Sequence, residues 1–318
     1  MSLLFGLHHP NYTFPGTSDD RLFDHVVASA KAAEDVGFDL FTVMDHFYQI
    51  RGVGPETDPM LEAYTTLAAV AAHTSRIKLS TLVTGVTYRN PALLVKQVTT
   101  LDVISKGRAL LGIGAAWNVD EHEGYGFEYP PIGRRMDRLE EAVQIAKLMF
   151  TEDRPSFEGK FYRIDRALNV PRPIQKGGPK ILIGGGGEQR TLRILAKYGD
   201  LGHWFGAPVE ELKRKKGVFE DHCAAVGRDP SEVTLTLGVG VAIVGSEREG
   251  KAILDRLPPE RRAMSRALTP EQTAEFLRQF IDAGFSGFTF NNPVLPTIEA
   301  IGLAGEMIKM VRGSSVPA

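Results

Sequence analysis

The sequence predicts an α/β fold, a closed (β/α)8 TIM barrel, on three observations. The chain of 318 residues is long for one ordinary domain but normal for a single α/β barrel. Short apolar runs typical of buried strands alternate with helix-like segments along its whole length. No linker or shift in composition divides it, so we expect one domain over residues 1–318. An open, doubly wound sheet is the alternative.

Eight strands are expected in this alternation. In chain order they are Leu3–His9, Phe38–Asp45, Ile77–Gly85, Arg108–Ala115, Lys180–Gly184, Leu201–Gly206, Val233–Gly245 and Phe285–Asn292. The helices that follow them are expected at Asp19–Val36, Pro59–Thr74, Ala92–Ile104, Arg134–Phe150, Glu188–Tyr198, Val209–Val226, Pro270–Ala283 and Thr297–Val311. Gly37 is the expected C-cap of the first helix.

Two segments interrupt the alternation and are predicted to be insertions. The first, about residues 151–178, is rich in Pro and Gly, and its stretch "PSFEGKFYRI" is typical of a small hairpin. The second, about residues 246–268, is polar.

Composition excludes several classes of partner. The formal net charge of −2 gives no electrostatic case for nucleic acid or an anionic membrane. The single cysteine, Cys223, excludes an internal disulfide, and no apolar run approaches the roughly 20 residues of a membrane span. The N-terminus lacks the basic and apolar regions of a signal peptide, so we expect a cytoplasmic protein. The partner that we expect is a small-molecule substrate.

Four consecutive glycines, Gly184–Gly187, stand between the fifth strand and its helix. Backbone N–H groups before a helix can hold a phosphate. No Lys-Ser/Thr pair follows, so this is not a P-loop, and Gln189 breaks the dinucleotide pattern. Either the glycines cradle an anion at the active end of the barrel, or they only allow close packing.

Asp45 and His46 close the second strand, where a barrel binds its ligand. They could be metal ligands, a general acid and base, or a satisfied hydrogen-bonding pair. His8 and His9 point to opposite faces of the first strand, so only one of them can face the interior. We therefore expect no metal, and a His46 that binds the cofactor or moves a proton.

Aromatic residues cluster near the strand ends, and as a set they favour a pocket for a flat ring system. They include Tyr88, Trp117, Trp204 and Phe205. The residues expected to contact the substrate are His9, Tyr88, Trp204 and Asn291.

Three stretches resemble the bacterial luciferase-like oxidoreductases, which use flavin or F420. They are "VMDHF", the block from Ser80 to Gly126 and "PKILIGGGGEQRTLRILAKYGD". Within the block, Asn90-Pro91, Gly107-Arg108 and "LGIGAAW" keep the family's spacing. The similarity is greatest to the F420-dependent branch.

This resemblance implies that the barrel mouth holds coenzyme F420, or FMN, and that the enzyme is a homodimer. It also implies a non-prolyl cis peptide between Leu82 and Val83, behind the cofactor ring. Catalytic roles would fall to His46 and Asp45. The residues implied to bind the cofactor are Leu82, Val83, Thr84, Gly85, Ala115, Ala116, Trp117, Gly185, Gly186, Gly187, Glu188 and Gln189.

The expected function is that of an F420-dependent oxidoreductase that transfers a hydride between F420 and an organic substrate. Two alternatives stay open: a monooxygenase using reduced FMN and oxygen, and a non-catalytic flavin-binding paralogue. Sugar-phosphate dehydrogenases of the family place a catalytic Glu where this chain has Trp117. This departure argues against sugar-phosphate oxidation.

Overall fold

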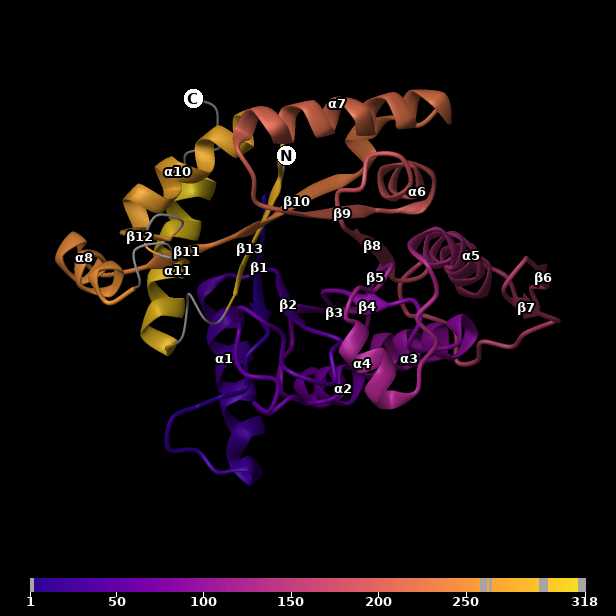
Figure 1. Ribbon diagram of the computed structural model, residues 1–318, viewed down its shortest axis with the longest axis horizontal. Coiled ribbons are helices and arrows are strands. Elements are labelled where there is room, and N and C mark those ends of the chain that lie inside the picture. Colours follow the sequence, from indigo (N-terminus) through magenta and orange to yellow (C-terminus); the bar gives the residue numbers. More distant parts are fainter. Residues whose placement is uncertain (1–2, 258–261, 263–264, 292–296, 314–318) are drawn as a thin grey trace.

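The computed structural model describes residues 3–257, 262, 265–291 and 297–313. Nine strands form one sheet in the order β3-β2-β1-β13-β10-β9-β8-β5-β4, and each pair in it is parallel (Figure 1). Their bounds are β1 Leu4–His9, β2 Leu40–Val43, β3 Lys78–Thr81, β4 Thr84–Gly85, β5 Leu110–Gly114, β8 Lys180–Gly184, β9 Leu201–Phe205, β10 Thr234–Val239 and β13 Gly287–Asn291. A parallel bridge between Leu79 and Ala109 joins β3 to β5 and closes the barrel, as predicted.

The predicted third strand consists of two short strands, β3 and β4. The peptide bond between Leu82 and Val83 is cis and lies in the gap between them, which confirms the bond that the family resemblance implied. Counted with these two as one, the barrel has eight strands.

Helices follow the strands along the chain. They are α1 Leu22–Val36, α2 Ala63–His73, α3 Pro91–Ile104, α4 Val119–Tyr125, α5 Ile132–Thr151, α6 Thr191–Tyr198, α7 Val209–Ala225, α8 Glu247–Asp255, α10 Pro270–Asp282 and α11 Ile298–Gly313, with 3-10 turns η1 Asp19–Arg21 and η2 Pro230–Glu232. The eight predicted helices are present, although α2 and α6 begin three or four residues later than predicted, and α4 and α8 were not predicted.

Local capping sets where several helices begin and end. Gly37, at φ +102°, ends α1 as predicted. α2 begins at Ala63 rather than at Pro59 because the Glu62 side chain accepts the Thr65 N–H and so fixes the first turn. Asn90 caps α3 in the same way, ahead of a proline at the first helical position.

Both insertions have structure of their own. In the first, β6 (Phe157–Glu158) and β7 (Arg163–Ile164) form the predicted antiparallel hairpin. In the second, α8 precedes β12 (Arg266–Leu268), which pairs with β11 (Val241–Ile243) outside the barrel sheet. β11 is the second half of the predicted strand Val233–Gly245, of which only β10 belongs to the barrel. The two insertions lie at opposite ends of the molecule (Figure 1). Residues 258–261 and 263–264 of the second insertion, and the predicted strand end at Asn292, lie outside the described residues.

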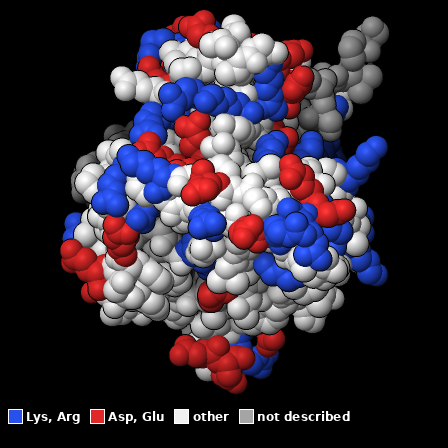
Figure 2. All heavy atoms as spheres, turned by 90° about the vertical axis from the view of Figure 1, so that its right-hand side faces the viewer, with Lys and Arg blue, Asp and Glu red and all other residues white. Residues whose placement is uncertain are grey.

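Large apolar side chains fill the barrel and pack its helices onto it. Phe5, Phe41, Phe288 and Phe290 are fully buried on neighbouring strands. On the face shown in Figure 2, basic and acidic side chains are interleaved, as the small net charge would suggest. Among the described residues, no helix is long and apolar enough to cross a membrane.

Candidate functional site

A cavity of about 950 Å³ opens at the carboxyl ends of the barrel strands. This is the end at which enzymes with this architecture bind their ligands, and the volume suits a drug-sized molecule or cofactor. Of the residues predicted for the site, those that line the cavity are Asp45, His46, Leu82, Val83, Thr84, Gly85, Tyr88, Ala115, Ala116, Trp117, Gly185, Gly187, Glu188, Gln189 and Asn291.

His9 does not line this cavity, which corrects its predicted place in the substrate site. Successive strand residues face opposite sides, and in β1 the residue that faces the cavity is His8. The His9 ring is fully buried beside Tyr12, Phe14 and Phe41, at centroid distances of 5.3 to 5.9 Å.

The prediction for Trp204 is wrong for the same reason, because neighbouring strand residues face opposite sides. In β9 the residue that faces the cavity is His203, while Trp204 is buried with its ring edge-on to Phe285 at 5.4 Å. Trp204 therefore belongs to the packing around the barrel and not to the substrate site.

Gly186 is the third predicted residue that does not line the cavity. A Cβ there would meet only the Lys215 Nζ, at 3.8 Å. The other glycines of the run have structural constraints: Gly185 has φ +112°, and a Cβ on Gly184 would lie 2.7 Å from the Val83 side chain. Close packing thus requires Gly184, while Gly185 and Gly187 present bare backbone to the cavity.

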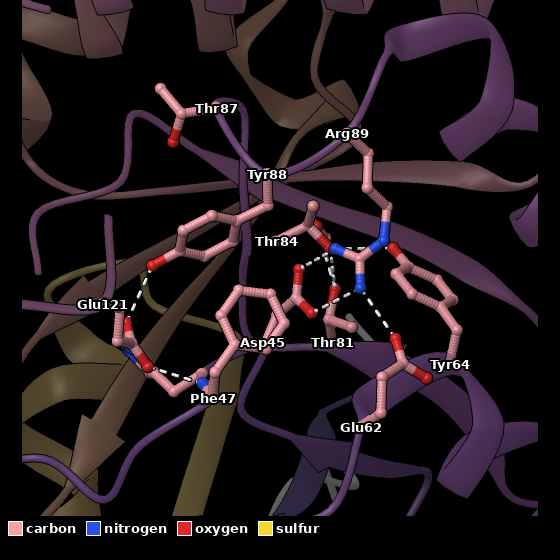
Figure 3. Close-up of polar contacts among 12 residues, drawn as sticks. Asp45, Phe47, Glu62, Tyr64, Thr81, Thr84, Thr87, Tyr88, Arg89 and Glu121 are labelled. Carbon is pink, nitrogen blue, oxygen red and sulfur yellow. Dashed lines mark hydrogen bonds and ion pairs between the residues drawn. The ribbon is translucent and has the colours of Figure 1, made fainter. Parts of the chain in front are cut away.

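His46 is held by Glu121, a residue absent from the predicted site. The His46 Nδ1 lies 2.7 Å from the Glu121 Oε2, and the Tyr88 hydroxyl donates to the same oxygen at 2.8 Å. The other carboxylate oxygen accepts the backbone N–H groups of Phe47 and Tyr48, at 2.5 and 3.0 Å. Figure 3 shows Tyr88 and Phe47 meeting Glu121 from two sides.

These bonds determine the charge of Glu121 and the tautomer of His46. Burial opposes ionisation of the fully buried Glu121, but the bonds from His46, Tyr48 and Tyr88 lower its pKa overall. An ionised carboxylate only accepts hydrogen bonds, so the His46 Nδ1 carries the proton and donates it. The Nε2 is then the ring nitrogen available to a ligand.

Glu121 lies on α4, a helix that the sequence analysis did not predict. α4 has 7 residues and a mostly polar sequence, so its apolar periodicity is too short to detect. Gly126, in the left-handed conformation, ends the helix, and this glycine was the one feature of the sequence that could have indicated a helix end here. His122 anchors the helix from inside, since its Nδ1 donates to the Asn118 carbonyl at 2.5 Å and its Nε2 lies 2.7 Å from the Thr87 hydroxyl.

Asp45 forms a separate ion-pair network. Arg89 donates to both Asp45 carboxylate oxygens, at 2.6 and 3.0 Å, and to Glu62 at 2.7 Å. Its guanidinium lies between the two carboxylates, beside the Tyr64 ring (Figure 3). Burial disfavours the Arg89 cation, yet the Asp45 carboxylate raises the pKa of Arg89 overall. Burial raises the pKa of the Asp45 carboxyl, although the ion pair with Arg89 opposes this rise. Because Arg89 engages both of its oxygens, the Asp45 carboxyl is fixed in orientation at the cavity wall.

Two further histidines line the cavity, His8 and His203. The His8 Nδ1 lies 2.9 Å from the Thr42 hydroxyl, and the His203 Nδ1 lies 2.8 Å from the Thr236 hydroxyl. Burial lowers the pKa of His8 to about 3 and that of His203 to about 4. Both rings are therefore neutral at pH 7.

The residues Ala115–Trp117, between β5 and α4, form an irregular segment whose carbonyl groups are held by hydrogen bonds from Arg135 and Tyr129. Ala116 has φ +61°, a conformation that costs a residue with a side chain about 1 kcal/mol. Arg135 donates to the Ala116 carbonyl at 2.5 Å, and the Tyr129 hydroxyl donates to the Trp117 carbonyl at 2.9 Å. Trp117 remains 56% exposed, with its ring edge-on to His46 at 5.4 Å.

Among the described residues, no group of three or more His, Cys, Asp and Glu side chains is arranged to hold a metal ion. The residues that line the cavity do present backbone amides, neutral imidazoles and aromatic rings. This combination suits an organic cofactor with a flat ring and an anionic tail.

The family described as luciferase-like monooxygenase matches residues 4–287, almost the whole chain. The chain belongs to this family. The membership accounts for the closed barrel, the cis peptide between its third-strand halves and the cavity at its carboxyl end.

Relatives and solved structures include several types of enzyme. The F420-dependent glucose-6-phosphate dehydrogenase of Nocardia farcinica is 30% identical over 305 residues, which cover 84% of this chain and 88% of that one. A solved F420-dependent secondary alcohol dehydrogenase, in complex with an F420-acetone adduct, superposes with a TM-score of 0.80 at 21% identity, covering 98% of this chain and 100% of the other. The EDTA monooxygenase of Chelativorans sp. BNC1 superposes with a TM-score of 0.84 at 17% identity, covering 99% and 95%. These two structures share the fold.

Proposed function

We propose that this protein is an F420-dependent oxidoreductase. The observation that carries the proposal is a single cavity lined both by His46, which Glu121 holds, and by the bare backbone of Gly185 and Gly187. The F420-dependent relatives at 30% identity support this cofactor.

The residues present fit such a cofactor. The ring would lie against Leu82 and Val83, and its phosphate would meet the backbone of Gly185 and Gly187, next to the start of α6. A flavin of the same shape would meet the same groups. F420, when bound, supplies the hydride chemistry.

The side chains of this chain would handle the proton and the geometry. His46, with its Nδ1–H fixed by Glu121, holds or gives a proton at Nε2. Asp45, through Arg89, fixes the wall behind it. Trp117, Ile132 and Phe205 give the cavity apolar surface that is exposed in the ligand-free chain and that a bound ring would cover.

Cofactor titration tests the proposal. The purified protein is titrated separately with F420 and with FMN while tryptophan fluorescence is followed. Trp204 is buried away from the cavity, so Trp117 reports on binding. Micromolar F420 binding with negligible FMN binding is expected, and the reverse preference would overturn the proposal. Oxygen-dependent turnover of the reduced cofactor would favour the monooxygenase, and binding without any turnover the non-catalytic paralogue.

Two matched glycine variants refine the phosphate assignment. Gly185→Ala places a methyl group on the cavity wall at φ +112°, and we expect about a tenfold loss of cofactor affinity, or ~1.4 kcal/mol. Gly186→Ala introduces the same methyl one residue on, where only Lys215 is near, and we expect a smaller loss. Equal affinities in two folded variants would count against this cradle. The homodimer implied by the resemblance and the cytoplasmic location expected from the N-terminal sequence remain predictions.

A further inference from the structure

Thr236 fixes the tautomer of His203. The Thr236 hydroxyl donates to the Gly202 carbonyl at 3.0 Å, because a carbonyl oxygen can only accept. The same hydroxyl lies 2.8 Å from the His203 Nδ1 and, having used its proton, must accept there. The Nδ1 is thus the protonated nitrogen. In the neutral ring, the Nε2 is left with an unprotonated lone pair.

Two glycines at the end of β10 have no side chain to cover this lone pair, so a recess lies over it. Gly238 and Gly240, at the end of the strand next to His203, both line the cavity. A Cβ on Gly238 would lie 3.6 Å from the His203 Nε2, and one on Gly240 would meet nothing within 4 Å. The recess is therefore open above the nitrogen.

The recess lies across the barrel from His46. In the sheet order, three strands separate β2 from β9 on one side, β1, β13 and β10. On the other side lie β3 and β4, which are the two halves of the third strand, and then β5 and β8. The cofactor is assigned to this second side. A molecule seated over His203 would thus face both the cofactor and His46.

The charged groups of the cavity are already paired. Among the described residues that line it, the Asp, Glu, Lys and Arg residues are Asp45, Glu188 and Arg190. Their partners are Arg89, Arg214 and Asp137, in that order. The two buried imidazoles that line the cavity, His8 and His203, are neutral and offer an anionic substrate no opposite charge.

We propose that His203 anchors the substrate by accepting a hydrogen bond at Nε2, and that the substrate is an uncharged molecule with a hydroxyl or N–H donor. The chemistry of this proposal rests on the proposed function, whereas its geometry depends only on the positions of His203, Thr236 and the two glycines. An uncharged substrate would differ from the phosphorylated sugar, glucose 6-phosphate, for which the Nocardia relative is named. Thr236 is the positioning residue that fixes the anchor's tautomer.

Nitrogen-15 NMR of histidine-labelled protein tests the anchor without turnover. Benzyl alcohol is the donor probe, benzyl methyl ether is its match without a donor, and benzyl phosphate is the charged match. The missing resonances of His203→Gln give the assignment. At pH 7 we expect a protonated Nδ1 and an unprotonated Nε2, with an Nε2 shift on adding the alcohol only. A protonated Nε2, equal effects of alcohol and ether, or tighter binding of the phosphate would overturn the proposal.

Three variants complete the test. Gly238→Ala covers the Nε2 at an ordinary contact distance, and about a tenfold weaker binding of benzyl alcohol is expected. Gly240→Ala adds the same methyl away from the nitrogen and is the matched control. Thr236→Val should let the proton leave Nδ1, and a His203 tautomer unchanged in that variant contradicts the argument. Probe binding without F420 binding would refute only the proposed function, while F420 binding with no preference for the donor would refute only this inference.

Discussion

His46 and His203 line one cavity from opposite walls of the barrel, and each has its Nδ1 bound so that its Nε2 is available. The partner of His46 is a carboxylate that accepts three further hydrogen bonds, whereas the partner of His203 is a single hydroxyl. A carboxylate stabilises an imidazolium, and a hydroxyl that already donates elsewhere gives no such charge stabilisation. The same side chain is therefore suited to moving a proton on one wall and to binding a neutral group on the other.

Removing the carboxylate should have the largest effect. Glu121→Gln keeps the size of the side chain, but an amide cannot accept from His46, Tyr88 and two backbone N–H groups together. We expect kcat in the F420 assay to fall about 10²-fold, as for loss of a general acid or base. The free energy of unfolding should fall by about 1–3 kcal/mol, since buried donors lose their acceptor.

A neighbour on the same helix provides the control for this variant. Glu123→Gln makes the identical change on the exposed face of α4 and should leave both quantities near those of the parent protein. If Glu121→Gln behaved like Glu123→Gln, the two walls of the cavity would not differ in the way described.

Acid should destabilise the fold through the histidines that lack a charged partner, including His9. Burial lowers the pKa of His9 to about 4, while the unfolded chain binds this proton near pH 6.5. Between these values the unfolded state holds more protons, so stability falls as the pH falls. At pH 5 the loss from one such histidine is roughly 2 kcal/mol.

His9→Phe isolates this effect, because His9 packs among aromatic rings and neither ring nitrogen has a partner among the described residues. We compare the free energy of unfolding of the variant with that of the parent protein at each pH. The difference should favour the variant by about 2 kcal/mol more at pH 5 than at pH 8. Denaturant unfolding at the two pH values measures it. The same difference at both values would mean that His9 is not held neutral.

Much of this arrangement followed from the sequence, and two errors of the prediction, His9 and Trp204, have the same physical origin. Most of the strands and the strand-end positions of Asp45 and His46 came from alternation alone. The predicted strand Val233–Gly245 is instead divided, since β10 belongs to the barrel sheet and β11 pairs with β12 outside it. His9 and Trp204 were assigned to the cavity in place of His8 and His203 because each pair occupies consecutive strand positions. Which of two polar or aromatic neighbours faces inward depends on the pleat, and a one-residue shift exchanges them.

Glu121 was missed for another reason. Its role depends on contacts 33 to 75 residues away in the chain, made by a helix too short to give a periodic signal. The cis peptide at Leu82 came only from the family resemblance, since local sequence does not encode such a bond. The sequence pattern of a single strand or helix carries no information about such contacts between residues far apart in the chain.

Tyr88→Phe should give the smallest effect and measures how far the His46 wall depends on any one donor. The variant removes one of four hydrogen bonds to Glu121 and leaves the ring, which packs edge-on against Phe47 at 4.9 Å. We expect a loss of about 1 kcal/mol in the free energy of unfolding and a few-fold lower kcat, because the remaining three donors still hold the carboxylate. Thermal unfolding and the F420 assay measure both. A kcat loss as large as that of Glu121→Gln would instead give the Tyr88 hydroxyl a part in the chemistry. His46, Glu121 and Tyr88 would then act together as a triad.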